Sequence, residues 1–113
     1  EAGDYDAVYT THPEENHTDP RAAADIVLSA TPKQIPVWGF EVWSPIGAPD
    51  SWTDITPYAD RKWKAIEAHR TQVERMEFVR AAQGVNQFRG ALLSKTIYAE
   101  ALLDLRKDPA FSQ

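Results

Sequence analysis

Residues 35–43 read IPVWGFEVW, and this stretch decides the fold class. Its even-numbered positions from Trp38 onward are apolar, and Val37 and Trp43 make the other side of an extended chain largely apolar as well. Such a strand is typical of a parallel sheet covered by helices on both faces. The stretch therefore predicts a buried strand in an α/β protein. Glu41 is the polar exception, and its carboxylate belongs either to a site or to a buried ion pair.

A strand and a helix are predicted before this stretch. Residues 5–11 (YDAVYTT) are rich in β-branched and aromatic side chains, which favour a strand. Asp19 is suited to the N-cap of the following helix and Pro20 to its first position, which predicts a helix over residues 21–30. The positions expected to face inward at helical spacing are Ala23, Ile26, Val27 and Ala30.

The second half of the chain is predicted to be mainly helical. Gly84 is expected to close one helix as a C-cap. The predicted elements are a short extended piece at 52–55, helices at 58–70 and 73–83, a polar loop at 86–90 and a last amphipathic helix at 92–105.

This order predicts a partial Rossmann-like three-layer α/β unit, with few, mainly parallel strands and covering helices. Residues 1–113 are expected to form a single domain that is incomplete, because two good strands are too few for a doubly covered sheet. Exposed strand edges must be covered. We therefore expect either a homo-oligomer or a complementing chain.

Charge and composition narrow the classes of function. The chain has 12 Lys and Arg residues against 17 Asp and Glu residues, a net charge of −5, and no concentrated basic face for a nucleic acid or an anionic membrane. It contains no cysteine, which excludes thiolate chemistry and Cys-ligated metals. No apolar run reaches the roughly 20 residues of a membrane span, and no secretory signal is visible, so a cytoplasmic protein is expected.

The residues that carry chemistry gather at 12–19 (HPEENHTD), between a predicted strand and a predicted helix. Two imidazoles and three carboxylates in eight residues offer metal ligands and groups for acid–base catalysis. Ligands of open α/β sheets bind at such strand ends. The spacing alone nevertheless favours a solvated loop, in which Asp19 serves as the helix cap.

Three segments resemble the LmbE/PIG-L family of zinc-dependent N-acetylglucosaminyl deacetylases. They are residues 17–23 (HTDPRAA), 40–45 (FEVWSP) and 84–90 (GVNQFRG). The resemblance runs in order along nearly the whole chain and corresponds to the C-terminal half of such an enzyme. It implies a deacetylase fold and an amino-sugar derivative as ligand.

The resemblance also implies roles for single residues. His17 matches the general acid or oxyanion stabiliser, and Asp19 matches the residue that supports the imidazoles. Pro20 stands where the family has a zinc ligand, and the N-terminal metal motif is absent. Zinc is therefore implied by the family but not expected to bind to this chain alone, unless His12, Glu14 or Glu15 substitutes.

Two functions remain open from the sequence. The first is a zinc-dependent amide hydrolase that is inactive by itself, with Arg89 and Trp52 as substrate contacts. Arg89 serves equally well as a structural residue that holds its loop to a helix end, whereas Trp52 is expected to be exposed near a ligand. The alternative is a non-catalytic α/β domain that self-associates or binds a ligand. His69 is expected to be structural.

Overall fold

The computed structural model describes residues 5–12, 20–42, 44–69 and 77–107, except for the side chains of Pro20 and Arg21. The chain forms two compact units: one of Glu1–Ser51 with Ala101–Gln113, and one of Trp52–Glu100. No helix in the described ranges is long and apolar enough to cross a membrane.

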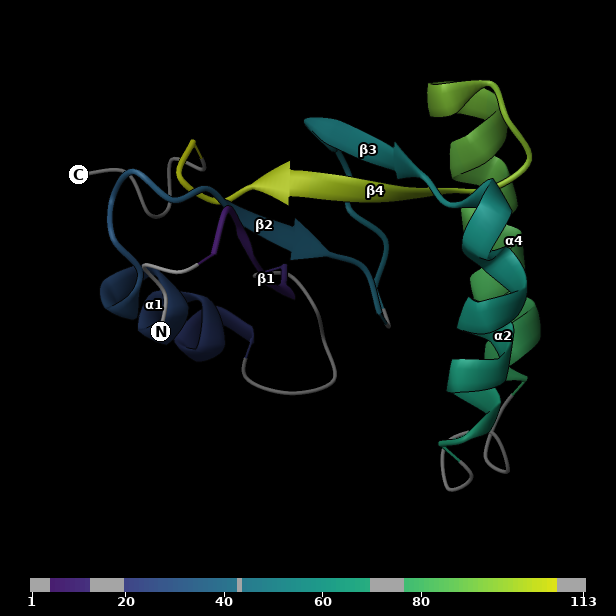
Figure 1. Ribbon diagram of the computed structural model, residues 1–113, viewed down its shortest axis with the longest axis horizontal. Coiled ribbons are helices and arrows are strands. Elements are labelled where there is room, and N and C mark those ends of the chain that lie inside the picture. Colours follow the sequence, from purple (N-terminus) through teal and green to yellow (C-terminus); the bar gives the residue numbers. More distant parts are fainter. Residues whose placement is uncertain (1–4, 13–19, 43, 70–76, 108–113) are drawn as a thin grey trace. The chain divides into compact units, whose positions relative to one another are not determined.

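The first unit begins with strand β1 (Val8–Thr11), helix α1 (Pro20–Ala30) and strand β2 (Val37–Phe40), which follow one another in Figure 1. The two strands are parallel and pair Val8 with Val37 and Thr11 with Phe40. The predicted strand–helix–strand order is therefore confirmed, with shorter strands than expected. After α1, the Thr31 hydroxyl donates to the Val27 carbonyl at 2.6 Å.

The core of this unit consists of Ala24, Val37 and Leu105, all fully buried. The partly buried side chains packed against it are Val8, Val27, Leu28 and Leu103. Helix α1 thus turns positions 24, 27 and 28 inward, whereas two of the predicted inward positions are exposed: Ile26, at 68%, and Ala30. The prediction was wrong because α1 is apolar around most of its circumference, and helical spacing does not choose between two apolar faces.

Strand β4 (Ala99–Asp104) replaces the second half of the helix predicted over residues 92–105, and only residues 92–94 of that prediction are helical. It pairs antiparallel with β2, with Phe40 opposite Leu102 and Trp38 opposite Asp104. Alanine and leucine favour helices locally, but pairing with a central strand overrides that preference. The sheet order is β1-β2-β4-β3. The α/β class is confirmed, and the sheet is mixed rather than mainly parallel.

Arg106, which follows β4, binds the turn between α1 and β2 through its side chain. Its Nε donates to the Ile35 carbonyl at 2.9 Å, and its Nη2 donates to the Pro32 carbonyl at 2.8 Å and the Thr31 carbonyl at 3.4 Å. A planar guanidinium suits several carbonyl acceptors at once.

The second unit contains most of strand β3 (Ser51–Asp54), a 3₁₀ turn η2 (Thr56–Tyr58) and two helices, α2 (Ala59–Glu67) and α4 (Phe78–Arg89). The helices lie side by side (Figure 1). The extended piece predicted at 52–55 is confirmed as β3, and the helix predicted at 58–70 is confirmed as α2 but ends at Glu67. The predicted helix at 73–83 falls partly outside the described residues.

The predicted polar loop at 86–90 is wrong, because residues 86–89 continue α4. Gly84 lies inside this helix rather than at its end, and a Cβ there would meet nothing within 4 Å. A wider π-type turn, η3 (Gly90–Ser94), follows and ends at Lys95 with φ 58°.

Trp63 of α2 meets Tyr98 edge to face, with ring centroids 5.2 Å apart.

Asp54 collects hydrogen bonds at the end of β3. Its Oδ1 accepts the Thr56 N–H and the Thr96 hydroxyl, each at 3.0 Å. Hydrogen bonds to the charged form, with the Thr56 backbone bond contributing most, lower the pKa of Asp54 below its ordinary value of 3.8. Its contribution to stability is therefore present above that ordinary value and is lost as the pH falls below it.

We expect the urea midpoint of unfolding to fall less steeply with acid in Asp54→Asn than in the parent chain, over the range from about pH 5 to about pH 3. Asp25→Asn, on the exposed side of α1, is the matched control and should follow the parent curve. Parallel curves for the parent and Asp54→Asn would contradict this assignment.

Candidate functional site

His12 stands directly after β1, at the carboxyl end of the parallel strand pair. Its N–H donates to the Phe40 carbonyl at 3.1 Å, which continues the ladder with β2 by one residue. Its side chain is 1% exposed, and Nε2 lies 2.6 Å from the Ser44 carbonyl oxygen. A carbonyl only accepts, so Nε2 carries a proton in this contact. His12 thus holds the segment after β2 against β1.

Gly39 makes room for this histidine. A Cβ on Gly39 would lie 3.0 Å from His12 Cα, 3.1 Å from His12 Cβ and 3.2 Å from Leu105 Cδ2. These distances are tighter than most real contacts of a Cβ. The glycine in the middle of the apolar stretch therefore lets the backbone of His12 and the side chain of Leu105 lie close to β2.

Glu41 organises the chain just past β2. Its Oε2 accepts the Ile46 N–H at 2.7 Å, and the side chain is half-buried. The sequence left two roles open for Glu41, a site residue or a member of a buried ion pair. The structure shows a third role, a hydrogen bond to the backbone of the turn that follows β2. Together with the His12 contact, it fixes the backbone that borders the strand ends.

The remaining residues of the polar segment, which include His17, Asp19, Glu14 and Glu15, lie outside the described residues. Chain order still requires residues 13–19 to connect the carboxyl end of β1 with the start of α1 at Pro20. Within the described part of the chain, no three His, Asp or Glu side chains gather where they could hold a metal ion. That zinc does not bind to this chain alone, unless His12, Glu14 or Glu15 substitutes as a ligand, stays a prediction.

Trp52 and Arg89 belong to the second unit. Trp52, on β3, is 47% exposed. Arg89 is 7% exposed at the end of α4, with its guanidinium carbon 5.5 Å from the centre of the Phe88 ring, so it is not a loop residue. Contact of either residue with a substrate stays a prediction. His69 is exposed just after α2.

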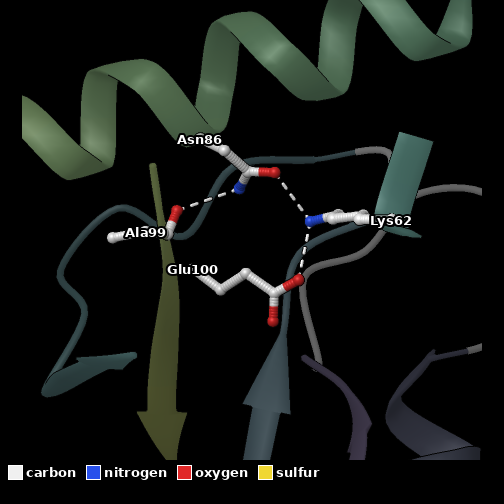
Figure 2. A network of polar contacts seen from close by, with 4 residues as sticks. All are labelled: Lys62, Asn86, Ala99 and Glu100. Carbon is white, nitrogen blue, oxygen red and sulfur yellow. Dashed lines mark hydrogen bonds and ion pairs between the residues drawn. The ribbon is translucent and has the colours of Figure 1, made fainter. Parts of the chain in front are cut away.

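A polar network that sequence reasoning missed ties α2, α4 and β4 together (Figure 2). Lys62 Nζ donates to Asn86 Oδ1 at 2.7 Å and to Glu100 Oε2 at 2.6 Å. Asn86 Nδ2 donates to the Ala99 carbonyl at 3.0 Å. The carbonyl fixes the orientation of the amide, so its oxygen faces the ammonium group.

Local sequence holds little that could have found this network. Lys62 and Glu100 are 38 positions apart, and only the fold pairs them. Asn86 carried the one available signal: a polar residue in a segment otherwise suited to an amphipathic helix. Because it is only 4% exposed, its side-chain groups need partners, and the network supplies them.

Comparisons with known proteins do not support the family expected from the sequence. No known protein family and no curated protein matches this chain. One solved structure that matches is GalB, the 4-carboxy-2-hydroxymuconate hydratase from Pseudomonas putida KT2440, with a TM-score of 0.66 and 22% sequence identity. The match covers 88% of this chain and 52% of the hydratase chain.

The LmbE/PIG-L deacetylase assignment is therefore wrong, because the matching structure is a hydratase and nothing found is a deacetylase. The predicted enzyme class, a hydrolase, is wrong for the same reason. The amino-sugar ligand rested on the same resemblance and is untested. What the comparison shows is a shared fold: this chain has the α/β architecture of part of that hydratase and spans about half of its length.

Proposed function

We propose that this chain contributes the acid–base part of a hydratase-type active site for a small carboxylated substrate. The observation that carries the proposal is His12, buried at the carboxyl end of β1 and bonded to the segment that leaves the carboxyl end of β2. The carboxyl ends of parallel strands are where ligands of open α/β sheets bind. The shared fold with a hydratase supports the choice of reaction class.

Hydration of a carbon–carbon double bond needs one group that takes a proton from water and another that gives a proton to carbon. Residues 13–19 supply groups of both kinds, with His17 as the residue best suited near neutral pH. His12 acts as a positioning residue, because its buried ring holds the Ser44 carbonyl rather than facing solvent.

The start of α1 suits a substrate carboxylate. Backbone N–H groups at a helix N-terminus attract anions, and the first turn of α1 contains no acidic residue. Asp19 precedes the helix, and its place in the proposal is to orient a neighbouring imidazole.

The test is calorimetric titration of the chain with 4-carboxy-2-hydroxymuconate. We expect His17→Gln to weaken binding roughly tenfold, the cost of one charge-assisted hydrogen bond. His69→Gln, a substitution of the same kind at an exposed position after α2, should leave the affinity unchanged. Circular dichroism checks that both variants fold.

Equal affinities for the parent and His17→Gln would contradict the proposed role of residue 17. No heat of binding at millimolar ligand would contradict the carboxylate site altogether. Because the chain spans about half of the hydratase, we expect the chain by itself to bind without turnover.

A further inference from the structure

Two side-chain contacts hold the segment that leaves the carboxyl end of β2. The first comes from His12, whose Nε2 lies 2.6 Å from the Ser44 carbonyl oxygen. The second comes from Glu41, whose Oε2 accepts the Ile46 N–H at 2.7 Å. Both contacts engage the backbone, one at an acceptor and one at a donor. They fix the chain on both sides of Pro45 and do not involve the side chain of Ser44.

Burial strengthens both contacts. His12 is 1% exposed and Ile46 is 5% exposed, so water competes poorly for the groups that they bond. Pro45 lies between the two bonded positions, and its ring restricts the backbone further. All of these residues belong to the first unit. The position of Ser44 is therefore set by the fold and does not depend on a ligand.

The Ser44 hydroxyl is a hydrogen-bonding group that the fold does not use. Among the described residues, it has no hydrogen-bond partner, and only the carbonyl of Ser44 is bonded. Ser44 is half-buried. In the same part of the chain, every fully buried side-chain nitrogen or oxygen has a partner. The hydroxyl is therefore open to solvent, and it can donate a hydrogen bond to a ligand.

Ser44 lies next to the start of the segment that carries the acid–base groups of the proposed site. Its carbonyl contacts His12, and residues 13–19 begin at the next position along the chain. Strands β1 and β2 are parallel, so the segments that follow them leave the same edge of the sheet. Ligands of open α/β sheets bind at that edge.

We propose that the Ser44 hydroxyl donates a hydrogen bond to a carboxylate oxygen of the substrate. This inference rests on the proposed hydratase-type site and adds to it a ligand contact from the segment after β2. A donor whose backbone is already fixed loses little freedom on binding, which favours affinity. His12 and Glu41 are positioning residues in this arrangement, because they act through the backbone that they hold.

The test is calorimetric titration of Ser44→Ala with 4-carboxy-2-hydroxymuconate. We expect the dissociation constant to rise about tenfold, the cost of one hydrogen bond to a charged group. The substitution keeps the carbonyl that His12 contacts, so the urea midpoint should match that of the parent chain. Ser44→Thr keeps a hydroxyl and should restore most of the affinity. Ser29→Ala, at an exposed position of α1, is the matched control and should bind like the parent.

A double-mutant cycle tests the positioning role of Glu41. Glu41→Ala removes the acceptor of the Ile46 N–H and should weaken binding, whereas Glu41→Gln keeps an acceptor and should bind like the parent. If Glu41 acts through the Ser44 hydroxyl, Glu41→Ala should weaken binding in the parent but not in Ser44→Ala. Additive effects of Glu41→Ala and Ser44→Ala would contradict this role.

The outcomes separate this contact from the proposed function. If the parent binds and Ser44→Ala binds equally well, the contact is wrong and the carboxylate site stands. If Ser44→Ala weakens binding and His17→Gln does not, the contact stands and the role of residue 17 is wrong. No heat of binding for the parent overturns both. A lower urea midpoint for Ser44→Ala would give the hydroxyl a structural role and also overturn the contact.

Discussion

Replacing Gly90 with alanine is expected to destabilise the second unit by about 2–3 kcal/mol, the upper range for forcing atoms into a packed site. The new Cβ would lie 2.5 Å from the Ile97 carbonyl oxygen, 2.7 Å from its carbon and 2.9 Å from the Thr96 carbonyl oxygen. These are backbone atoms, so no side chain can rotate away. The backbone of Gly90 is helical, with φ −60°, so the loss is steric and not conformational.

Gly84→Ala is the matched control for Gly90→Ala. Gly84 lies in the interior of α4, where a Cβ meets nothing within 4 Å. Alanine there should stabilise the helix by about 0.5–1 kcal/mol, because it restricts the unfolded chain and favours helix. Urea unfolding followed by circular dichroism measures both. The account of Gly90 fails if the two substitutions shift the midpoint in the same direction.

Asn86→Ala is expected to lower the free energy of unfolding by about 2–4 kcal/mol. The substitution removes a buried amide and leaves both of its hydrogen-bond partners unpaired. The Ala99 carbonyl loses its donor at 3.0 Å and Lys62 loses an acceptor at 2.7 Å. Lys62 keeps its ion pair with Glu100. The Lys62 side chain is 28% exposed and that of Glu100 38%, so water compensates for part of the hydrogen bond that Lys62 loses.

The matched control is Gln87→Ala, one position along α4 and exposed, which should change stability by less than about 0.5 kcal/mol. Asn86→Asp keeps an acceptor for Lys62 but turns a carboxylate oxygen toward the Ala99 carbonyl, so we expect it to restore stability only in part. Full stability of Asn86→Ala in urea would mean that the network of Figure 2 contributes nothing to the unit.

The sequence predicts the first unit well because its pattern and its tertiary role agree. Residues 37–40, within the apolar stretch at 35–43, form the inner strand β2, which is paired with β1 and β4. Pro20 begins α1 as expected. The inward face of α1 was misjudged, since an all-round apolar helix leaves Ala24 and Ile26 equally plausible as core residues until the sheet selects one.

The second half was harder to predict because local preference and tertiary pairing disagree there. Residues 99–104 (AEALLD) favour a helix by composition, yet they form β4. Gly84 was expected to mark a helix end but lies inside α4. In this helix region, packing requires glycine at position 90, because a Cβ there would meet Ile97. Ile97 comes close only through the chain reversal after α4.

The candidate site shows the same division. The cluster of imidazoles and carboxylates at 12–19 made this segment the candidate site, because strand ends and helix starts recur as ligand sites, although its spacing alone favoured a solvated loop. It could not show that His12 is buried against the Ser44 carbonyl, since that contact spans 32 positions. The match of family motifs led to the wrong family, because short motifs fix neither the reaction nor the rest of the fold.

The first unit is discontinuous, and this has a consequence for synthesis on the ribosome. Its core joins Ala24 and Val37 to Leu105, so the helix and parallel strands emerge long before the residue that completes their packing. Domains generally fold in order as they leave the ribosome. Here residues 52–100 must be translated before Leu105, and we expect residues 8–40 to remain open to chaperones and proteases until Leu105 has emerged.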